Sequence, residues 1–211
     1  MTSASTTTPF ENRYARSFVR AFLAGVCISI GGCVYMNVAP DIKWVGAVLF
    51  AVGLTAVCAF NLDLYTGKVG YWVEKSPSYG LVLLVIIAGN LVGCLLIGLM
   101  MPYDACGIAV EAKLDQEWYT AIFKGFMCGI LMFIAVEFYK QRGSFLGIVF
   151  CVPTFIMAGF EHSIADMFYF FSAQVFSVDA VVYIILVIIG NGIGGMLVPF
   201  CRKFMTEPET A

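Results

Sequence analysis

The chain has 211 residues, of which 61% are hydrophobic and only 12% are charged, and its mean hydropathy is +0.90. A water-soluble domain could not cover that much apolar surface, so the composition favours a membrane protein. The net charge of −2 at pH 7 shows no basic excess, which argues against nucleic acid as a partner. Seven of the eight cysteines lie in or at the end of apolar runs, Cys106 falls in a polar loop, and no CxxC pair occurs. We interpret them as small core residues.

Six apolar stretches are candidates for crossing a bilayer, which takes about 20 residues of helix. Polar residues interrupt the second stretch around Asn61 and the fifth around Glu161. We therefore predict an all-α, polytopic membrane protein in which the second and fifth helices are broken. The six predicted spans are, in chain order, Ser17–Tyr35, a span that begins near Lys43, Tyr79–Met101, Trp118–Tyr139, a span that begins near Phe145, and Ala180–Phe204.

Basic residues are distributed unevenly between the two ends of these spans. Nine of the twelve fall on one side, and the loop between the third and fourth spans, on the other side, is acidic. Because loops rich in Lys and Arg stay in the cytoplasm, we expect both termini there and the protein in the inner (plasma) membrane. The nine are Arg13, Arg16, Arg20, Lys68, Lys75, Lys140, Arg142, Arg202 and Lys203.

The sequence contains an internal repeat. "AGNLVG" at 88–93 recurs as "IGNGIG" at 189–194, and "RAFLAG" at 20–25 is echoed by "KGFMCG" at 124–129. The offsets predict one channel domain, 1–211, built from two repeats of three spans, about 14–102 and about 117–204, with short cytoplasmic tails. Because an odd number of spans reverses the direction in the membrane, the repeats must be inverted relative to each other, a pattern typical of transporters and channels.

The two breaks lie at membrane depth. Roughly 16 residues precede the first break and roughly 14 the second, or about 24 Å and about 21 Å of helix. Both breaks then lie inside a core about 30 Å thick, where irregular backbone must be buried in protein or line a cavity. We expect Asn61, Asp63 and Glu161 to be structural, the two carboxylates accepting released backbone N–H groups or bonding across subunits. His162, the only histidine, is left to face the pathway.

These motifs resemble the formate/nitrite transporter family over nearly the whole chain. They are "GFEHS" at 159–163, "LYTG" at 64–67, and the "GNxxG" motifs that contain Asn90 and Asn191. The resemblance implies a homopentameric channel with an aquaporin-like fold in the lipid bilayer, which passes small monovalent anions of weak acids and needs no cofactor or metal. Formate, nitrite and hydrosulfide all remain open as the substrate.

The resemblance also implies roles for individual residues. His162 would be the central pore histidine, and Thr66 the hydroxyl that hydrogen-bonds to it or to the substrate. The cytoplasmic constriction would be formed by Leu54 and Tyr65, and the opposite constriction by Phe50 and Phe155. An anion that enters such a passage loses its hydration, at several kcal/mol after relaxation. We therefore expect a neutral imidazole that donates a hydrogen bond and favours the neutral form of the substrate.

Two departures from the family pattern concern lysines. A vestibule lysine is usual near the start of the fourth span, where this chain has Glu117, and Lys124 lies seven residues further on along the same helix face. Lys124 is either its functional replacement or a lysine that reaches to the interface. Lys68, in "YTGK", is a second candidate for a role at the cytoplasmic mouth.

Two other classes of protein are less consistent with the sequence. An aquaporin-like channel for neutral solutes would fit the inverted repeat, but its paired NPA motifs are absent. An intramembrane enzyme is less favoured, because the chain has no second histidine for a metal or haem and no GxSxG motif. We therefore predict a channel and not an enzyme.

Overall fold

The structure, a computed structural model, describes residues 9–205, and all regular secondary structure in this range is helical. Residues 1–8 and 206–211, which hold most of the two expected tails, lie outside the described part. The helices are α1 (Pro9–Val38), α2 (Lys43–Ala59), α3 (Tyr65–Lys68), the 3₁₀ helix η1 (Val69–Glu74), α4 (Tyr79–Met100), α5 (Asp104–Leu114), α6 (Trp118–Arg142), α7 (Leu146–Met157), α8 (Ser163–Ser172) and α9 (Val178–Met205).

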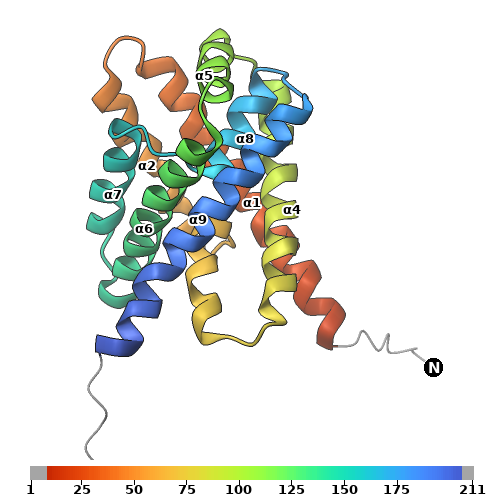
Figure 1. Ribbon diagram of the computed structural model, residues 1–211, viewed down its shortest axis with the longest axis vertical. Helices are drawn as coiled ribbons and strands as arrows, with labels where there is room; N and C mark the ends of the chain where they lie inside the picture. Colours follow the sequence, from red (N-terminus) through yellow and green to blue (C-terminus); the bar gives the residue numbers. More distant parts are fainter. Residues whose placement is uncertain (1–8, 206–211) are drawn as a thin grey trace, which may run out of the picture.

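Four of these helices, α1 from Arg13 onward, α4, α6 and α9, are long and apolar enough to cross a membrane. The helices α2 and α7 are apolar but shorter, with 17 and 12 residues. The start of α1 and the end of α9 lie at one end of the molecule, and α5 lies at the opposite end (Figure 1). Large apolar side chains are exposed along all four long helices, as expected for surfaces that face lipid or another subunit.

Glycines set the distance between the long helices in two pairs. In the first pair α1 packs on α4, and a Cβ at Gly93 would overlap the carbonyl oxygen of Phe22. In the second pair α6 packs on α9, and a Cβ at Gly194 would overlap the carbonyl oxygen of Phe126. Small residues allow such close backbone contact, which favours helix association in a membrane. The "GNxxG" motifs therefore lie at the contacts between the long helices.

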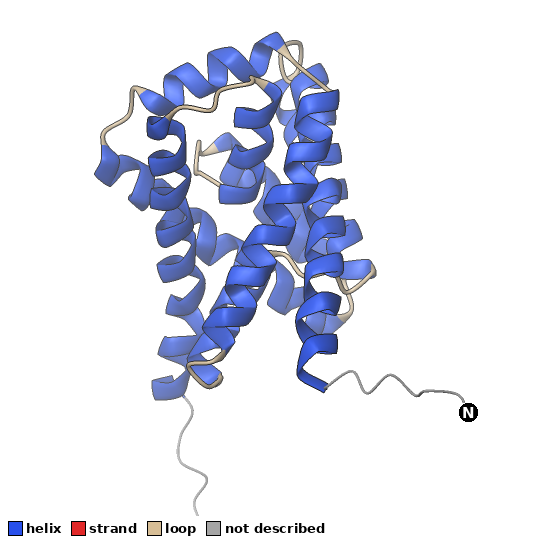
Figure 2. Cartoon of the chain, turned by 90° about the vertical axis from the view of Figure 1, so that its right-hand side faces the viewer, coloured by secondary structure: helices blue, strands red, loops and turns tan. Residues whose placement is uncertain are grey.

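Two non-helical segments lie inside the bundle rather than at its ends (Figure 2). We name residues 60–64, between α2 and α3, the first junction, and residues 158–162, between α7 and α8, the second junction. Each begins with the same helix-ending geometry. A residue with positive φ, Asn61 at 50° or Gly159 at 71°, follows the helix, and the next N–H bonds five residues back, Leu62 to Val57 and Phe160 to Phe155.

The acidic segment between α4 and α6 is not the loop that the sequence suggested. It contains α5, which packs on α8 and α9. Cys106, assigned to a polar loop, lies on the buried face of α5 and is fully buried. All eight cysteines are free thiols. The helix has 11 residues and weak amphipathicity, so its stability comes from packing rather than from a local pattern.

Candidate pore site

Asn90 of α4 ties the first junction to the long helices. It is fully buried, and its Oδ1 accepts a hydrogen bond from the Tyr65 backbone N–H at 3.0 Å. Its Nδ2 donates to the carbonyl oxygens of Ala21 at 2.8 Å and Asp63 at 3.0 Å. One amide side chain thus satisfies a free N–H at the start of α3 and a carbonyl that the junction leaves unpaired.

Asn191 of α9 does the same for the second junction. Its Oδ1 accepts from the Ser163 backbone N–H at 2.9 Å, and its Nδ2 donates to the carbonyl oxygens of Gly125 at 2.8 Å and Glu161 at 2.9 Å. The two amides, and not the two carboxylates, accept the backbone N–H groups at these helix starts. The expected role of Asp63 and Glu161 as backbone acceptors is therefore wrong for the groups that the structure describes.

The two carboxylates instead pair with lysines. Asp63 lies 2.8 Å from Lys68 and accepts a hydrogen bond from Ser17 at 3.1 Å. Glu161 pairs with Lys113, which also lies 2.9 Å from Asp166. A carboxylate inside a bundle is tolerated when a cation or hydrogen-bond donor compensates its charge.

His162 ends the second junction and caps α8. Its Nδ1 accepts a hydrogen bond from the Ala165 backbone N–H at 3.2 Å, so this nitrogen carries no proton. The ring is then the neutral tautomer with its proton on Nε2, assigned from the hydrogen-bond network. Nε2 lies 2.9 Å from Oγ1 of Thr66 in α3, so the imidazole donates to the hydroxyl. Both side chains are buried, and the bond joins the two junction regions.

Two phenylalanine rings lie beside the imidazole. Phe155 of α7 stacks on His162 with ring centroids 5.7 Å apart and an angle of 27°. Phe50 of α2 contacts Phe155 edge to face at 6.1 Å and 87°. Both rings are almost fully buried. The pair therefore forms an apolar layer against the imidazole ring.

A cavity of about 410 Å³ opens on the α5 side of His162, and we name it the α5-side cavity. Phe155 lines it together with charged and polar groups from five different segments of the chain. These groups are Lys43, Lys113, Lys124, Glu161, His162 and Asp166.

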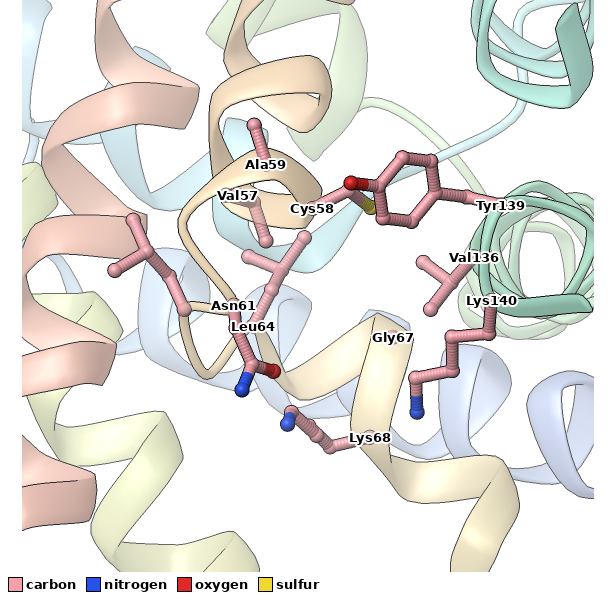
Figure 3. Close-up of a pocket in the computed structure, with 11 residues that line it drawn as sticks. Val57, Cys58, Ala59, Asn61, Leu64, Gly67, Lys68, Val136, Tyr139 and Lys140 are labelled. Atoms are coloured by element: carbon pink, nitrogen blue, oxygen red, sulfur yellow. The ribbon is translucent and has the colours of Figure 1, made fainter. Parts of the chain in front are cut away.

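A second cavity, of about 290 Å³, lies toward the start of α1 and the end of α9 (Figure 1), and we name it the terminal-side cavity. Figure 3 shows Asn61 and Lys68 on one side of it and Lys140, from α6, across from them. Gly67, next to Thr66, also lines this cavity. The Thr66–His162 hydrogen bond therefore lies between the two cavities.

The remaining predicted residues are placed as follows. Lys124 lines the α5-side cavity and donates to Gln116 Oε1 at 2.6 Å. Glu117 is exposed ahead of α6 and does not line that cavity. Leu54 is buried in α2, and the Tyr65 hydroxyl donates to the Ile188 carbonyl of α9 at 3.0 Å. Neither Leu54 nor Tyr65 lines either cavity.

Lys113 is a site residue that the sequence did not single out. It projects from α5 to Glu161 and Asp166, and its amine also lies over the rings of Tyr169 and Tyr183, 5.7 and 6.0 Å from their centroids. Burial alone would lower the pKa of Lys113, but the two carboxylates outweigh it and raise the pKa above its ordinary value. Lys113 is therefore protonated at physiological pH. The available signal was that two buried carboxylates require a cation.

Within residues 9–205, no group of three or more His, Cys, Asp or Glu side chains could hold a metal ion. What the site offers is a pair of cavities, an apolar layer and a hydrogen-bonded hydroxyl–imidazole pair, set in a bundle of membrane-crossing helices. This combination defines a membrane transport protein.

Comparison with known proteins identifies the family. The model of the formate/nitrite transporter family matches residues 2–204, so the chain belongs to that family. The formate channel FocB of Escherichia coli (strain K12) is 28% identical over 190 residues, covering 74% of this chain and 67% of FocB. Because the family and this relative are transporters and channels, the chain is a transport protein and not an enzyme.

Two solved structures share the fold. One is described as an FNT family ion channel, with a TM-score of 0.85 and 22% identity, covering 93% of this chain and 92% of that chain. The other is a pentameric formate channel with formate bound, with a TM-score of 0.78 and 23% identity, covering 92% and 98% of the two chains. At these identities the likeness concerns the fold.

Proposed function

We propose that the chain forms a channel for small monovalent anions of weak acids, such as formate, nitrite or hydrosulfide, with His162 at the centre of its pore. The observation that carries this proposal is the Thr66–His162 hydrogen bond of 2.9 Å between the two cavities. The formate channel FocB and the pentameric formate channel add support for the substrate class.

In the membrane, α2 with α3 and η1 would form the second of six spans, and α7 with α8 the fifth. The two inverted repeats, about 14–102 and about 117–204, are supported by the matching bonds of Asn90 and Asn191. The basic residues favour a cytoplasmic location for both termini in the plasma membrane. The pentameric neighbour supports a homopentamer, with one pore through each subunit.

Permeation through such a pore is governed by desolvation. An anion that passes between Phe50 and Phe155 would lose most of its hydration, which costs several kcal/mol or more in a low-dielectric passage. Protonation to HCOOH, HNO₂ or H₂S removes most of that cost. Lysines in both cavities concentrate the anion at the mouths, and His162 offers its Nε2–H to the solute in exchange for Thr66.

The test compares two variants of His162 in proteoliposome uptake of formate, nitrite and hydrosulfide, with acetate and water as further solutes. His162→Asn retains both an acceptor for the Ala165 N–H and a donor, since asparagine is a good N-cap, but it cannot titrate. His162→Phe removes both functions. We expect His162→Phe to abolish anion uptake and His162→Asn to retain it, and the pH profile of His162→Asn between about pH 5 and pH 8 shows whether titration of the imidazole contributes to uptake.

Two outcomes would contradict the proposal in different ways. Water flux without anion flux in the unaltered protein would indicate an aquaporin-like channel instead. Wild-type uptake in the His162→Phe variant would remove His162 from the pathway. A third comparison locates the proton source: identical pH profiles in the unaltered protein and His162→Asn would show that the imidazole lines the pore without controlling protonation.

A further inference from the structure

The group of charged side chains around Glu161 contains more carboxylates than cations. Lys113 lies between two carboxylates, 2.9 Å from Asp166 Oδ1 and in direct contact with Glu161 Oε2. Asp166 is 1% exposed and Glu161 5%. Among the described residues, Lys113 is the one cation that forms ion pairs with these two acids. Lys124 lines the same cavity but donates its hydrogen bond to Gln116.

One carboxylate oxygen of this group has no partner. Within residues 9–205, Asp166 Oδ2 is buried and accepts no hydrogen bond. Glu161 Oε1 receives one long hydrogen bond, from Gln116 at 3.4 Å. Titratable groups from several segments lie around Asp166, and of the three lysines that line the cavity, Lys43, Lys113 and Lys124, it is Lys113 that contacts Asp166. These groups are Lys113 of α5, Glu161 of the second junction, Cys128 of α6, Tyr169 of α8, Tyr183 of α9, and, further off along the same cavity, Tyr35 of α1.

We propose that Glu161 and Asp166 share one proton, and that this pair delivers it to the anion in the α5-side cavity. Two largely buried carboxylates that meet at one ammonium group repel each other, and the single cation balances only one of them, so a proton held by the pair removes the uncompensated charge. A proton on Asp166 Oδ2 also turns an unpartnered charged oxygen into a hydrogen-bond donor. Both acids line the cavity, so an entering anion can reach them.

The delivery step is balanced. The acidic O–H of the pair breaks, its proton bonds to the substrate oxygen or sulfur, and the neutral acid forms while the pair gains one negative charge. Water outside the cavity then returns a proton to the pair. This inference rests on the proposed channel function and specifies the source of the proton.

The geometry of His162 indicates that the proton transferred to the substrate comes from another group. Nδ1 accepts from the Ala165 N–H, so the ring carries a single proton, on Nε2, directed at Thr66. Release of that proton would leave an imidazolate anion in a buried site, which is far less stable than a carboxylate. His162 can therefore orient a solute by hydrogen bonding, but it is a poor store of protons.

The first junction provides an internal control. Asp63 is also buried and also contacts a lysine, Lys68, at 2.8 Å, but the pair is one acid with one cation. A balanced pair has no reason to hold a further proton. The variants Asp166→Asn and Asp63→Asn thus make the same chemical change in two carboxylates that differ in charge balance.

The first measurement is infrared spectroscopy of the purified full chain in lipid nanodiscs at neutral pH without substrate. A protonated carboxyl group has a C=O stretching band that shifts in deuterated water. We expect this band in the unaltered protein and in Asp63→Asn. It should be lost in Asp166→Asn and in Glu161→Gln, because either change leaves one acid for Lys113. Both variants are made so that the test still holds if one of them does not fold, and folding is checked by size-exclusion chromatography.

No such band in the unaltered protein, or a band that persists in a folded Asp166→Asn or Glu161→Gln variant, would overturn the shared proton. The second measurement is formate uptake at neutral external pH. The uptake rate of Asp166→Asn should fall about a hundredfold or more, the range of a positioned acid, and should approach that of the unaltered protein at acid pH. Unchanged uptake with a lost band would overturn delivery alone. A band in a protein that transports no anion would refute the channel function and leave the proton site standing.

Discussion

Replacing Asn191 with alanine tests the role of a single amide in shaping the site. The side chain makes three buried hydrogen bonds, at 2.8 to 2.9 Å, to Gly125, Glu161 and Ser163. Two of these partners flank His162 in the sequence, so the same amide fixes the backbone on both sides of the imidazole. Its loss should lower both the stability of the protein and the rate of anion uptake.

The size of the effect follows from those three bonds. Hydrogen bonds between membrane helices contribute about 0.6 kcal/mol each on average, which gives a lower limit of about 2 kcal/mol. Leaving three buried backbone groups unpaired costs about 1–3 kcal/mol for each, an upper limit of about 9 kcal/mol. Because Glu161 lines the α5-side cavity, water can reach part of the gap. We expect a loss of about 3–5 kcal/mol between these limits.

Asn37→Ala is the matched control. Asn37 also donates two hydrogen bonds, to Cys33 O at 2.8 Å and to the Tyr103 hydroxyl at 3.1 Å, but it is exposed, so water can replace them. The Asn37→Ala substitution should lower the free energy of unfolding by less than about 0.5 kcal/mol. Both variants are compared by denaturant titration in mixed micelles, followed by tryptophan fluorescence. A loss in the free energy of unfolding for Asn191→Ala that is within about 1 kcal/mol of the loss for Asn37→Ala, roughly the net contribution of one hydrogen bond, would refute this reasoning. Other contacts would then hold the second junction in place.

Two further predictions concern helix packing and charge. Gly194→Ala should destabilise the protein by about 1–3 kcal/mol or more, because its Cβ would overlap the Phe126 carbonyl oxygen. The control Gly107→Ala, which has open space around it, should be neutral or slightly stabilising. Equal melting temperatures for the two variants would contradict this prediction. Lys124→Ala should slow anion uptake at low salt, with a deficit that shrinks as salt rises; an unchanged salt dependence would show that Lys124 matters only through its bond to Gln116.

The helical class and the long apolar helices could be predicted from the sequence because they depend on local composition. Sustained hydropathy identified α4, α6 and α9 with ends within two or three residues of those observed. For α1 the helix starts at Pro9, well before the predicted span at Ser17, because its first turns are polar and hydropathy does not register them. An apolar pattern therefore finds the part of a helix in lipid, and not its extension into water.

The lysine that pairs with Glu161 and Asp166 could not be predicted, because this ion pairing joins segments that are distant in the sequence. Hydropathy favoured a loop for the segment that forms α5, and nothing local indicates that Lys113 reaches the second junction, 48 residues away along the chain. Asp63 and Glu161 were expected to accept backbone N–H groups or to bond across subunits, but the N–H groups at the starts of α3 and α8 are accepted by Asn90 and Asn191. The family resemblance implied that Thr66 hydrogen-bonds to His162 or to the substrate, and the structure has the bond to His162 at 2.9 Å, while their role in permeation stays a prediction.

The two junctions share backbone geometry and differ in charge, and this difference bears on how a pore could serve an anion. With one proton shared by Glu161 and Asp166, as proposed, Lys43, Lys113 and Lys124 face a single ionised carboxylate, so the α5-side cavity is electropositive. In the terminal-side cavity Lys68 is paired with Asp63 and Lys140 adds a further cation, so that mouth is electropositive as well. On this proposal an anion would be attracted from both sides, while the apolar layer of Phe50 and Phe155 would admit it only as the neutral acid.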